Sequence, residues 1–178
     1  MYSTKIDPKF NKNQNPKIGL IALASDYTIE KDFINVIKDK KIDFFVNRIE
    51  CFNPLTSENL IKMSEKITEV TKDILPNEKI DCVVYGCTSG TIAAGYQSVE
   101  KKIKKAKPEA EVTTPSTASV KALKRLNLNK IAIFTPYPKK LNDEVIDFFK
   151  KENFQITANS YFDIASDIDI GKVDANYL

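Results

Sequence analysis

A cysteine that directly follows a short apolar segment is the residue of this sequence best placed to do chemistry. Residues 80–85 read as a buried parallel strand, and Gly86 allows a sharp turn before Cys87 at the start of the next helix. Thr88 and Ser89 follow and offer hydroxyl and backbone N–H groups. Because a helix N-terminus carries partial positive charge, we expect the pKa of Cys87 to be lowered and its thiolate to be reactive.

The composition restricts what such a thiolate can do. The 178 residues include no histidine and three cysteines, Cys51, Cys82 and Cys87. Nucleophile pairs that depend on histidine are therefore excluded, and so are most zinc sites, which need more sulfur or imidazole ligands than the sequence holds. Cys51 and Cys82 read as small packing residues. We expect no metal site.

The overall composition predicts a globular protein outside the membrane. Hydrophobic residues make up 42% of the chain, and the longest apolar run, residues 18–24, is too short to span a bilayer. No signal peptide precedes this run, so we expect a cytoplasmic protein with reduced thiols. The net charge of +3, from 27 basic and 24 acidic residues, does not indicate a nucleic-acid partner. The sequence leaves a homodimer open.

Strand patterns recur along the chain after a tail. Residues 1–16 are rich in asparagine and lysine with little apolar periodicity, and we interpret them as a flexible tail. The runs that read as buried strands are residues 17–24, 42–50, 80–85, 111–114, 130–135 and 154–161.

Helices are predicted between these strands. One begins after the polar turn at residues 25–28, and another carries apolar residues every three or four positions from Leu60 to Ile74, which indicates about five uninterrupted turns. A third is expected over residues 89–106. Ser116 and Thr117 are expected to cap a fourth helix, with Leu126 on its buried side. Two more are expected to begin near residues 138 and 166.

Regular alternation of strand and helix is typical of parallel sheets covered by helices on both faces. The pattern restarts near residue 115, so we expect an α/β fold with two similar lobes, residues 17–114 and 115–178. Ligands of parallel sheets bind beyond the carboxyl ends of the strands. One pocket between the lobes could gather the polar residues at those ends, which are Ser25, Asp26, Thr28, Cys87, Thr88, Ser89, Thr135 and Tyr137.

Three segments at predicted strand ends carry a resemblance to a known family. They are Tyr85-Gly86-Cys87-Thr88-Ser89-Gly90, Thr113-Thr114-Pro115-Ser116-Thr117-Ala118, and Ile131-Ala132-Ile133-Phe134-Thr135-Pro136-Tyr137 with Asn142 following. Taken together and in this order, they resemble the aspartate/glutamate racemase superfamily. The resemblance is closest to the branch that holds maleate isomerase, arylmalonate decarboxylase and the ectoine-utilisation racemase-like proteins. It covers roughly residues 17–175.

The resemblance implies a cofactor-independent enzyme in which a cysteine from each lobe faces a small carboxylate substrate. Cys87 matches the first-lobe cysteine, and Thr88 and Ser89 match residues that hold the carboxylate and stabilise an enediolate. Tyr137 matches a tyrosine that reaches the same carboxylate. In the family's racemases the cysteines act as base and acid, whereas in maleate isomerases the first cysteine adds to the double bond. Cys87 is thus predicted to be a thiolate base or a nucleophile.

The sequence departs from this family in its second lobe. A second-lobe cysteine should follow the region of residues 172–178, and residues 115–178 contain none. We therefore expect an incomplete second lobe with three strands, residues 111–114 included. The chain is interpreted as a fragment of a protein of about 240 residues, or alternatively as a truncated relative that has lost two-base chemistry.

A second departure concerns the substrate. Asp26 and Asp167 stand where maleate isomerases carry asparagine, and an ionised aspartate repels a dicarboxylate. A substrate with one carboxylate and an amine or amide group fits the two aspartates better. The alternative is that each aspartate only caps a helix, and for Asp167 the two interpretations have equal weight.

Two classes of function remain open. The first is an isomerase or racemase of a small carboxylic acid, and the second is a catalytically inactive protein that binds a carboxylate or a partner chain. A flavodoxin-like nucleotide-binding domain is not favoured, because no glycine-rich phosphate-binding motif occurs. The enzyme hypothesis also predicts that Cys87 alkylates with iodoacetamide faster than Cys51 and Cys82 below neutral pH.

Overall fold

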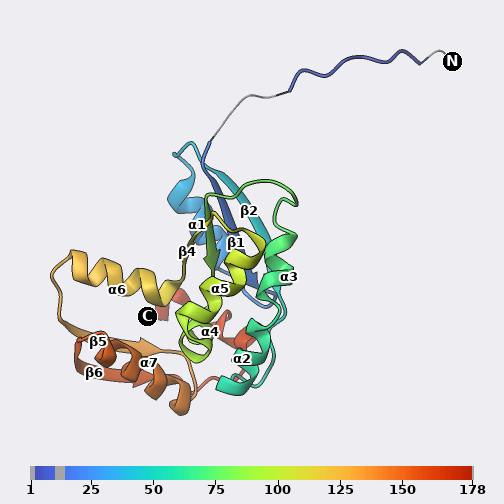
Figure 1. Cartoon of the computed structure of the whole chain (residues 1–178). Coiled ribbons are helices and arrows are strands. Elements are labelled where there is room, and N and C mark those ends of the chain that lie inside the picture. The colour runs from blue at the N-terminus through green and yellow to red at the C-terminus, as the bar shows by residue number, and fades with distance from the viewer. Residues whose placement is uncertain (1–2, 11–14, 178) are drawn as a thin grey trace.

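Two parallel sheets organise the computed structural model, which describes residues 3–10 and 15–177 (Figure 1). Residues 3–10 are exposed and have no regular secondary structure. The first sheet has the strand order β2-β1-β3-β4 and the second pairs β5 with β6, and all neighbours are parallel, as predicted. The strands are β1 (Lys17–Leu23), β2 (Asp43–Ile49), β3 (Cys82–Tyr85), β4 (Glu111–Thr113), β5 (Lys130–Thr135) and β6 (Gln155–Tyr161).

Helices follow most of the strands and cover the sheets. They are α1 (Ile29–Ile37), α2 (Ser57–Ser64), α3 (Ile67–Lys72), α4 (Thr88–Ala94), α5 (Tyr96–Ala106), α6 (Pro115–Arg125), α7 (Lys139–Lys151) and α8 (Asp167–Ile170), with a 3₁₀ turn at Ala175–Tyr177. In the part of the chain that the structure describes, no helix is long and apolar enough to cross a membrane.

Two helices that the periodicity predicts as continuous are each broken in two. After α2, the N–H groups of Glu65 and Lys66 bond to carbonyls three residues back, both at 3.1 Å, so the helix tightens and ends. The apolar spacing continues into α3, where Ile67 is fully buried, and this continuity hides the break in the sequence. The second break lies at Gly95, whose φ of +80° ends α4 and starts α5 in a conformation that favours glycine.

The prediction that residues 111–114 belong to the second sheet is wrong. β4 pairs with β3, so the described part of the second sheet has two strands and not the three expected. The cap of α6 also differs from the prediction. Thr114 is the N-cap residue, and it exchanges side-chain hydrogen bonds with Thr117 at 3.2 and 3.3 Å, while Pro115 opens the helix. Because α6 ends at Arg125, Leu126 lies outside it and is 66% exposed rather than buried.

Buried apolar side chains form separate clusters around the two sheets. One face of the first sheet contributes Ile21 and Val83 to the largest cluster, and the other face buries Leu20 and Val84 beneath α1. The second sheet has its own cluster, formed by Val120, Ile133, Val145, Phe149 and Phe154. The boundary of the two lobes at residue 115 stays a prediction. Helix α4 contacts α2 and α5 as well as α6 and α7, and it therefore lies where the two groups of elements meet.

Candidate active site

Cys87 lies immediately beyond the carboxyl end of β3 and is the N-cap residue of α4. Its Sγ accepts a hydrogen bond from the backbone N–H of Gly90 at 3.2 Å, and the hydroxyl of Ser89 lies 3.9 Å from the same sulfur. The Cys87 carbonyl accepts a hydrogen bond from the hydroxyl of Thr91 at 2.6 Å. The predicted placement of this thiol between a buried strand and a helix N-terminus is confirmed.

Gly86, directly before the cysteine, is required for close packing rather than for a left-handed turn. Gly95 is the described glycine with positive φ, and Gly86 is not. A Cβ on Gly86 would stand 2.7 Å from Cδ1 of Ile29 and 3.2 Å from the carbonyl oxygen of Ile21. The absence of a side chain lets β1 and α1 approach the turn that carries the thiol.

A cavity of about 250 Å³ opens beside Cys87. All six site residues predicted from the sequence line this cavity, namely Asp26, Cys87, Thr88, Ser89, Tyr137 and Asp167. They come from the loop after β1, the start of α4, the loop after β5 and the start of α8. Of the strand-end residues predicted to share one pocket, Ser25 and Thr135 do not line this cavity, and the others do, namely Asp26, Thr28, Cys87, Thr88, Ser89 and Tyr137. The roles of the lining residues stay predictions.

Larger hollows lie elsewhere on the molecule. One of about 600 Å³ lies at the amino ends of β3 and β4, opposite to Cys87, and lysine, glutamate and proline residues contribute much of its lining. Within residues 3–10 and 15–177, no group of three or more cysteine, aspartate or glutamate side chains is arranged to hold a metal ion. The smaller cavity is the one that combines a thiol with several hydrogen-bond donors.

The pKa of Cys87 is shifted in the direction opposite to the prediction. Burial raises this pKa from the ordinary value of 9.0 to about 11, although hydrogen bonds from the Gly90 N–H and the Ser89 hydroxyl lower it. The side chain is only 3% exposed, so removal of the thiolate from water outweighs the field of the helix N-terminus. The thiol is largely protonated at neutral pH. The expected lead of Cys87 in iodoacetamide labelling therefore loses its physical basis.

The raised pKa predicts that the protein loses stability at alkaline pH. A thiol whose pKa is higher in the folded state contributes stability that is complete below its unfolded value of about 9.0 and is lost as pH rises through about 11. For Cys87 alone we expect a loss on the order of 2 kcal/mol in the free energy of unfolding. Urea unfolding from pH 8 to 11 measures this loss. The Cys87→Ala variant should lose less, and equal losses in both proteins would contradict the assignment.

Tyr137 follows β5 and lies at the cavity beside the start of α4. Burial first, and then the charge of Cys87, raise the pKa of Tyr137 to about 12, although hydrogen bonding by Ser89 and Thr88 lowers it. The hydroxyl is therefore neutral at physiological pH and remains a hydrogen-bond donor. Thr88 and Ser89 lie beside the Tyr137 hydroxyl and offer further hydrogen-bond donors.

Asp167 is held by two loops of the first sheet. Its carboxylate accepts a hydrogen bond from the hydroxyl of Ser25, and its backbone N–H donates to Oδ1 of Asn53 at 3.0 Å. Burial raises the pKa of Asp167, and the charge of Asp26 raises it too, whereas the Ser25 hydroxyl lowers it. The N-cap of α8 is Ser166, so the alternative that Asp167 caps the last helix is wrong.

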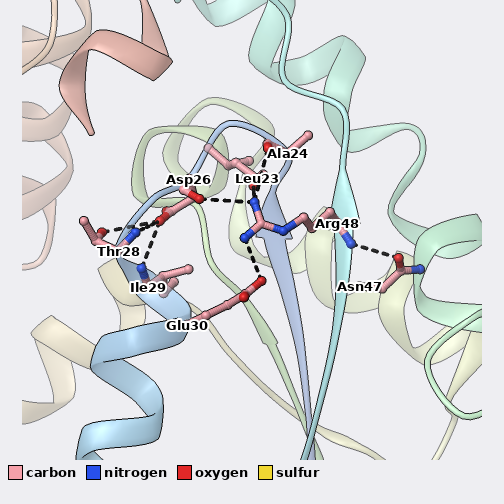
Figure 2. Close-up of polar contacts among 8 residues, drawn as sticks. All are labelled: Leu23, Ala24, Asp26, Thr28, Ile29, Glu30, Asn47 and Arg48. Carbon is pink, nitrogen blue, oxygen red and sulfur yellow. Dashed lines mark hydrogen bonds and ion pairs between the residues drawn. The ribbon is translucent and has the colours of Figure 1, made fainter. Parts of the chain in front are cut away.

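Asp26 bonds to the backbone at the start of α1, whose N-cap residue is Thr28, and it also lines the cavity. Its Oδ1 accepts hydrogen bonds from the N–H groups of Thr28 at 2.7 Å and Ile29 at 2.9 Å (Figure 2). One oxygen of this carboxylate is thus directed at the start of α1. The prediction that Asp26 also contacts substrate stays open.

Arg48 fixes the loop that carries Ser25 and Asp26. One guanidinium nitrogen, Nη1, donates to the carbonyls of Leu23, Ala24 and Asp26 at 3.1, 3.2 and 3.1 Å, and Nη2 donates to Glu30 at 2.8 Å (Figure 2). Arg48 reads as a surface residue in the sequence, because it is a polar residue within strand β2. No sequence signal pointed to it, since its partners are backbone carbonyls.

Of the other two cysteines, one lies near the site and one does not. Burial first, and then the charges of Asp167 and Cys87, raise the pKa of Cys51 to about 12, which places Cys51 close to both groups. Cys51 lies two residues beyond the end of β2, so the strand-end rule would have found it had it not been treated as a packing residue. Cys82 packs against the small cluster on the other face of the sheet, as predicted.

Comparisons with known proteins place the chain in a defined group. A family model described as arylmalonate decarboxylase matches residues 54–178. A maleate isomerase of Geobacillus stearothermophilus is 22% identical over 172 residues, and one of Pseudomonas putida is 25% identical over 171 residues. Both matches cover 89% of this chain and 68% of the relative.

Solved structures show the same fold. The maleate isomerase Iso of Pseudomonas putida superposes with a TM-score of 0.82 at 18% identity, over 93% of this chain and 71% of that one. A mutant of the Nocardia farcinica maleate cis-trans isomerase with a covalently bound succinylcysteine intermediate gives 0.81 at 19% identity, over 92% and 70%. Unliganded arylmalonate decarboxylase gives 0.67 at 21% identity, over 92% and 68%. The predicted two-lobed α/β fold class is confirmed.

Proposed function

Because this chain belongs to the arylmalonate decarboxylase family, we propose that it is a cofactor-independent enzyme that isomerises or racemises a small carboxylic acid. The observation that carries the proposal is the cavity in which the Cys87 thiol, Thr88, Ser89 and Tyr137 meet. The relatives named as maleate isomerases support the reaction class. Cys87 is the reacting group, as a thiolate base or as a nucleophile.

The substrate carboxylate is assigned to the start of α4. The N–H groups of Thr88 and Ser89 lie in the first turn of the helix, where backbone donors have no acceptor within the helix. Their hydroxyls and that of Tyr137 add further donors on the same cavity wall. These groups, together with the helix dipole, stabilise the negative charge that an enediolate gathers on the carboxylate oxygens.

Of the two reactions, alkene isomerisation needs one thiol. The thiolate forms a C–S bond to one alkene carbon while the π electrons move onto the neighbouring carbon and its carboxylate. Rotation about the resulting single bond follows, and collapse of the enediolate then expels the thiolate and restores the double bond. Racemisation needs an acid on the opposite face as well. Residues 115–178 contain no cysteine.

The two aspartates define the other end of the substrate. Asp167 presents a half-buried carboxylate to the cavity and Asp26 lies beside it, which disfavours a second carboxylate. An amide N–H₂ or an amine donates to such oxygens. The substrate class that fits is therefore a small cis-2-enoic acid that ends in an amide or amine, of which maleamate is a simple example.

A substrate panel tests the proposed function. The protein is incubated in deuterium oxide with maleamate, maleate, aspartate and asparagine, and proton NMR follows both cis–trans conversion and exchange at the α-carbon. We expect conversion of maleamate to its trans isomer, faster than conversion of maleate. Absence of conversion and of exchange for every acid would overturn the enzyme assignment.

A second candidate function, binding of a partner strand without catalysis, is favoured by a groove along β5. This groove has a volume of about 540 Å³ and lies between β5, α6 and α7, with Phe134 and Leu123 among its apolar walls. In the first sheet β1 is paired on both sides, whereas β5 pairs only with β6 among the described residues. A parallel apolar strand would complete the second sheet. This candidate predicts a folded protein that is inactive on the whole panel.

A further inference from the structure

Tyr85, the last residue of β3, carries a hydroxyl whose position calls for an explanation. The side chain is fully buried, and it belongs to the same apolar cluster as Cys87 and Met63. Its hydroxyl has no hydrogen-bond partner among the described residues. A buried hydroxyl without a partner costs about 1–3 kcal/mol, and phenylalanine would fill the same space without that cost.

The hydroxyl and the reactive sulfur both adjoin Gly90. If Gly90 carried a Cβ, that atom would stand 2.8 Å from the Tyr85 hydroxyl oxygen and 2.7 Å from Sγ of Cys87. Both atoms therefore border the space that a Gly90 side chain would occupy. The same glycine donates its N–H to the sulfur at 3.2 Å, so the sulfur already has one hydrogen-bond donor from the helix.

The pKa shifts of the two groups make Tyr85 the hydrogen-bond donor and the Cys87 sulfur the acceptor. Among the influences on the pKa of Cys87, the Tyr85 hydroxyl lowers it, as do the Gly90 N–H and the Ser89 hydroxyl, against the larger effect of burial. Burial first, and then the charge of Cys87, raise the pKa of Tyr85. The phenol therefore keeps its proton when the thiol loses its own. A neutral thiol is a weak acceptor, and a thiolate is a strong one.

We propose that the Tyr85 hydroxyl donates a hydrogen bond to the Cys87 thiolate when the sulfur loses its proton. Tyr85 is then a positioning residue for the reacting thiol. The unpartnered hydroxyl of the resting protein is then a donor held ready for the charged state. A side chain at Gly90 would clash with both groups. The inference rests on the proposed function in one respect, since it takes Cys87 as the group that ionises.

The test compares Tyr85→Phe with a matched loss of a hydroxyl. Tyr96→Phe is the control, because Tyr96 begins the neighbouring helix α5 and its hydroxyl donates to the carbonyl of Val112 in β4 at 3.0 Å. The protein is labelled with carbon-13 at cysteine Cβ, the Cys87 resonance is assigned from Cys87→Ala, and its shift is followed against pH. We expect the pKa of Cys87 to rise by about one unit in Tyr85→Phe, a roughly tenfold smaller thiolate fraction at a given pH. Tyr96→Phe should titrate as the parent protein does.

A second measurement avoids strongly alkaline conditions. Alkylation of Cys87 by iodoacetamide between pH 7 and 9, read by peptide mass spectrometry, reports the thiolate fraction. We expect roughly tenfold slower labelling in Tyr85→Phe. Mere loosening of the packing would expose the sulfur and speed the labelling. An unchanged Cys87 titration, or faster labelling, would overturn the proposal. Both readouts use the protein without substrate. A protein that is inactive on the acid panel can therefore still confirm or overturn the role of Tyr85.

Discussion

Replacing Cys87 by alanine is expected to abolish cis–trans conversion and α-carbon exchange, by a factor of at least about 10³. The reason is that the sulfur is the group that forms the bond to substrate or takes its proton, and the alanine side chain does neither. Proton NMR of the acid panel in deuterium oxide measures the loss. Because Cys87 is buried in the largest apolar cluster, circular dichroism should accompany the assay to show that the variant is folded.

Cys82→Ala is the matched control for this variant. Cys82 lies in the small cluster on the other face of the sheet, so its replacement should leave turnover within about twofold. The contrary result is informative as well. Turnover retained in Cys87→Ala but lost in Cys51→Ala would assign the chemistry to Cys51, which lies close to Asp167 and Cys87.

Replacing Asp167 by asparagine is expected to shift the substrate preference toward dicarboxylates. Removal of one negative charge from the cavity wall relieves a repulsion of about 1–4 kcal/mol at contact distance, which corresponds to roughly a fivefold or greater gain in affinity for maleate. Asparagine keeps an oxygen that accepts the Ser25 hydroxyl, so the loop stays anchored. The affinity for maleamate should fall, because its amide loses a charged acceptor.

Titration of the variant with maleate and maleamate measures both changes. Asp169→Asn is the control, since Asp169 lies in the same short helix but is exposed and pairs with Lys172 at 2.8 Å. That control should leave both affinities unchanged. An Asp167→Asn protein whose maleate affinity equals that of the parent would show that Asp167 does not face the substrate.

The strands and the meeting of site residues were predictable from the sequence because both follow from short-range patterns. Apolar runs such as residues 130–135 have ends marked by turn residues, and parallel pairing brings the carboxyl ends of the strands together. The pairing of β4 with β3 was not predictable. A three-residue strand has too little pattern to identify its neighbour, and hydrogen bonds between distant segments decide it.

The chemistry of the site depended on features that local sequence does not hold. The helix N-terminus beside Cys87 could be read from the sequence, but the burial of the sulfur could not. Burial reverses the direction in which the pKa of Cys87 shifts. Tyr85 reads as an ordinary strand residue until its hydroxyl is found without a partner. Arg48 binds backbone carbonyls, which leave no mark on the residue pattern.

The most direct test of the central claim compares two alkylating reagents of similar size at Cys87. Iodoacetate carries a carboxylate that the donors of Thr88, Ser89 and Tyr137 would hold beside the sulfur, and iodoacetamide is neutral. Peptide mass spectrometry gives both rates at each cysteine, with Cys51 and Cys82 as internal references. A carboxylate-binding cavity around a reacting thiol predicts a higher iodoacetate-to-iodoacetamide ratio at Cys87 than at the other two. A ratio at Cys87 equal to or below theirs would contradict it.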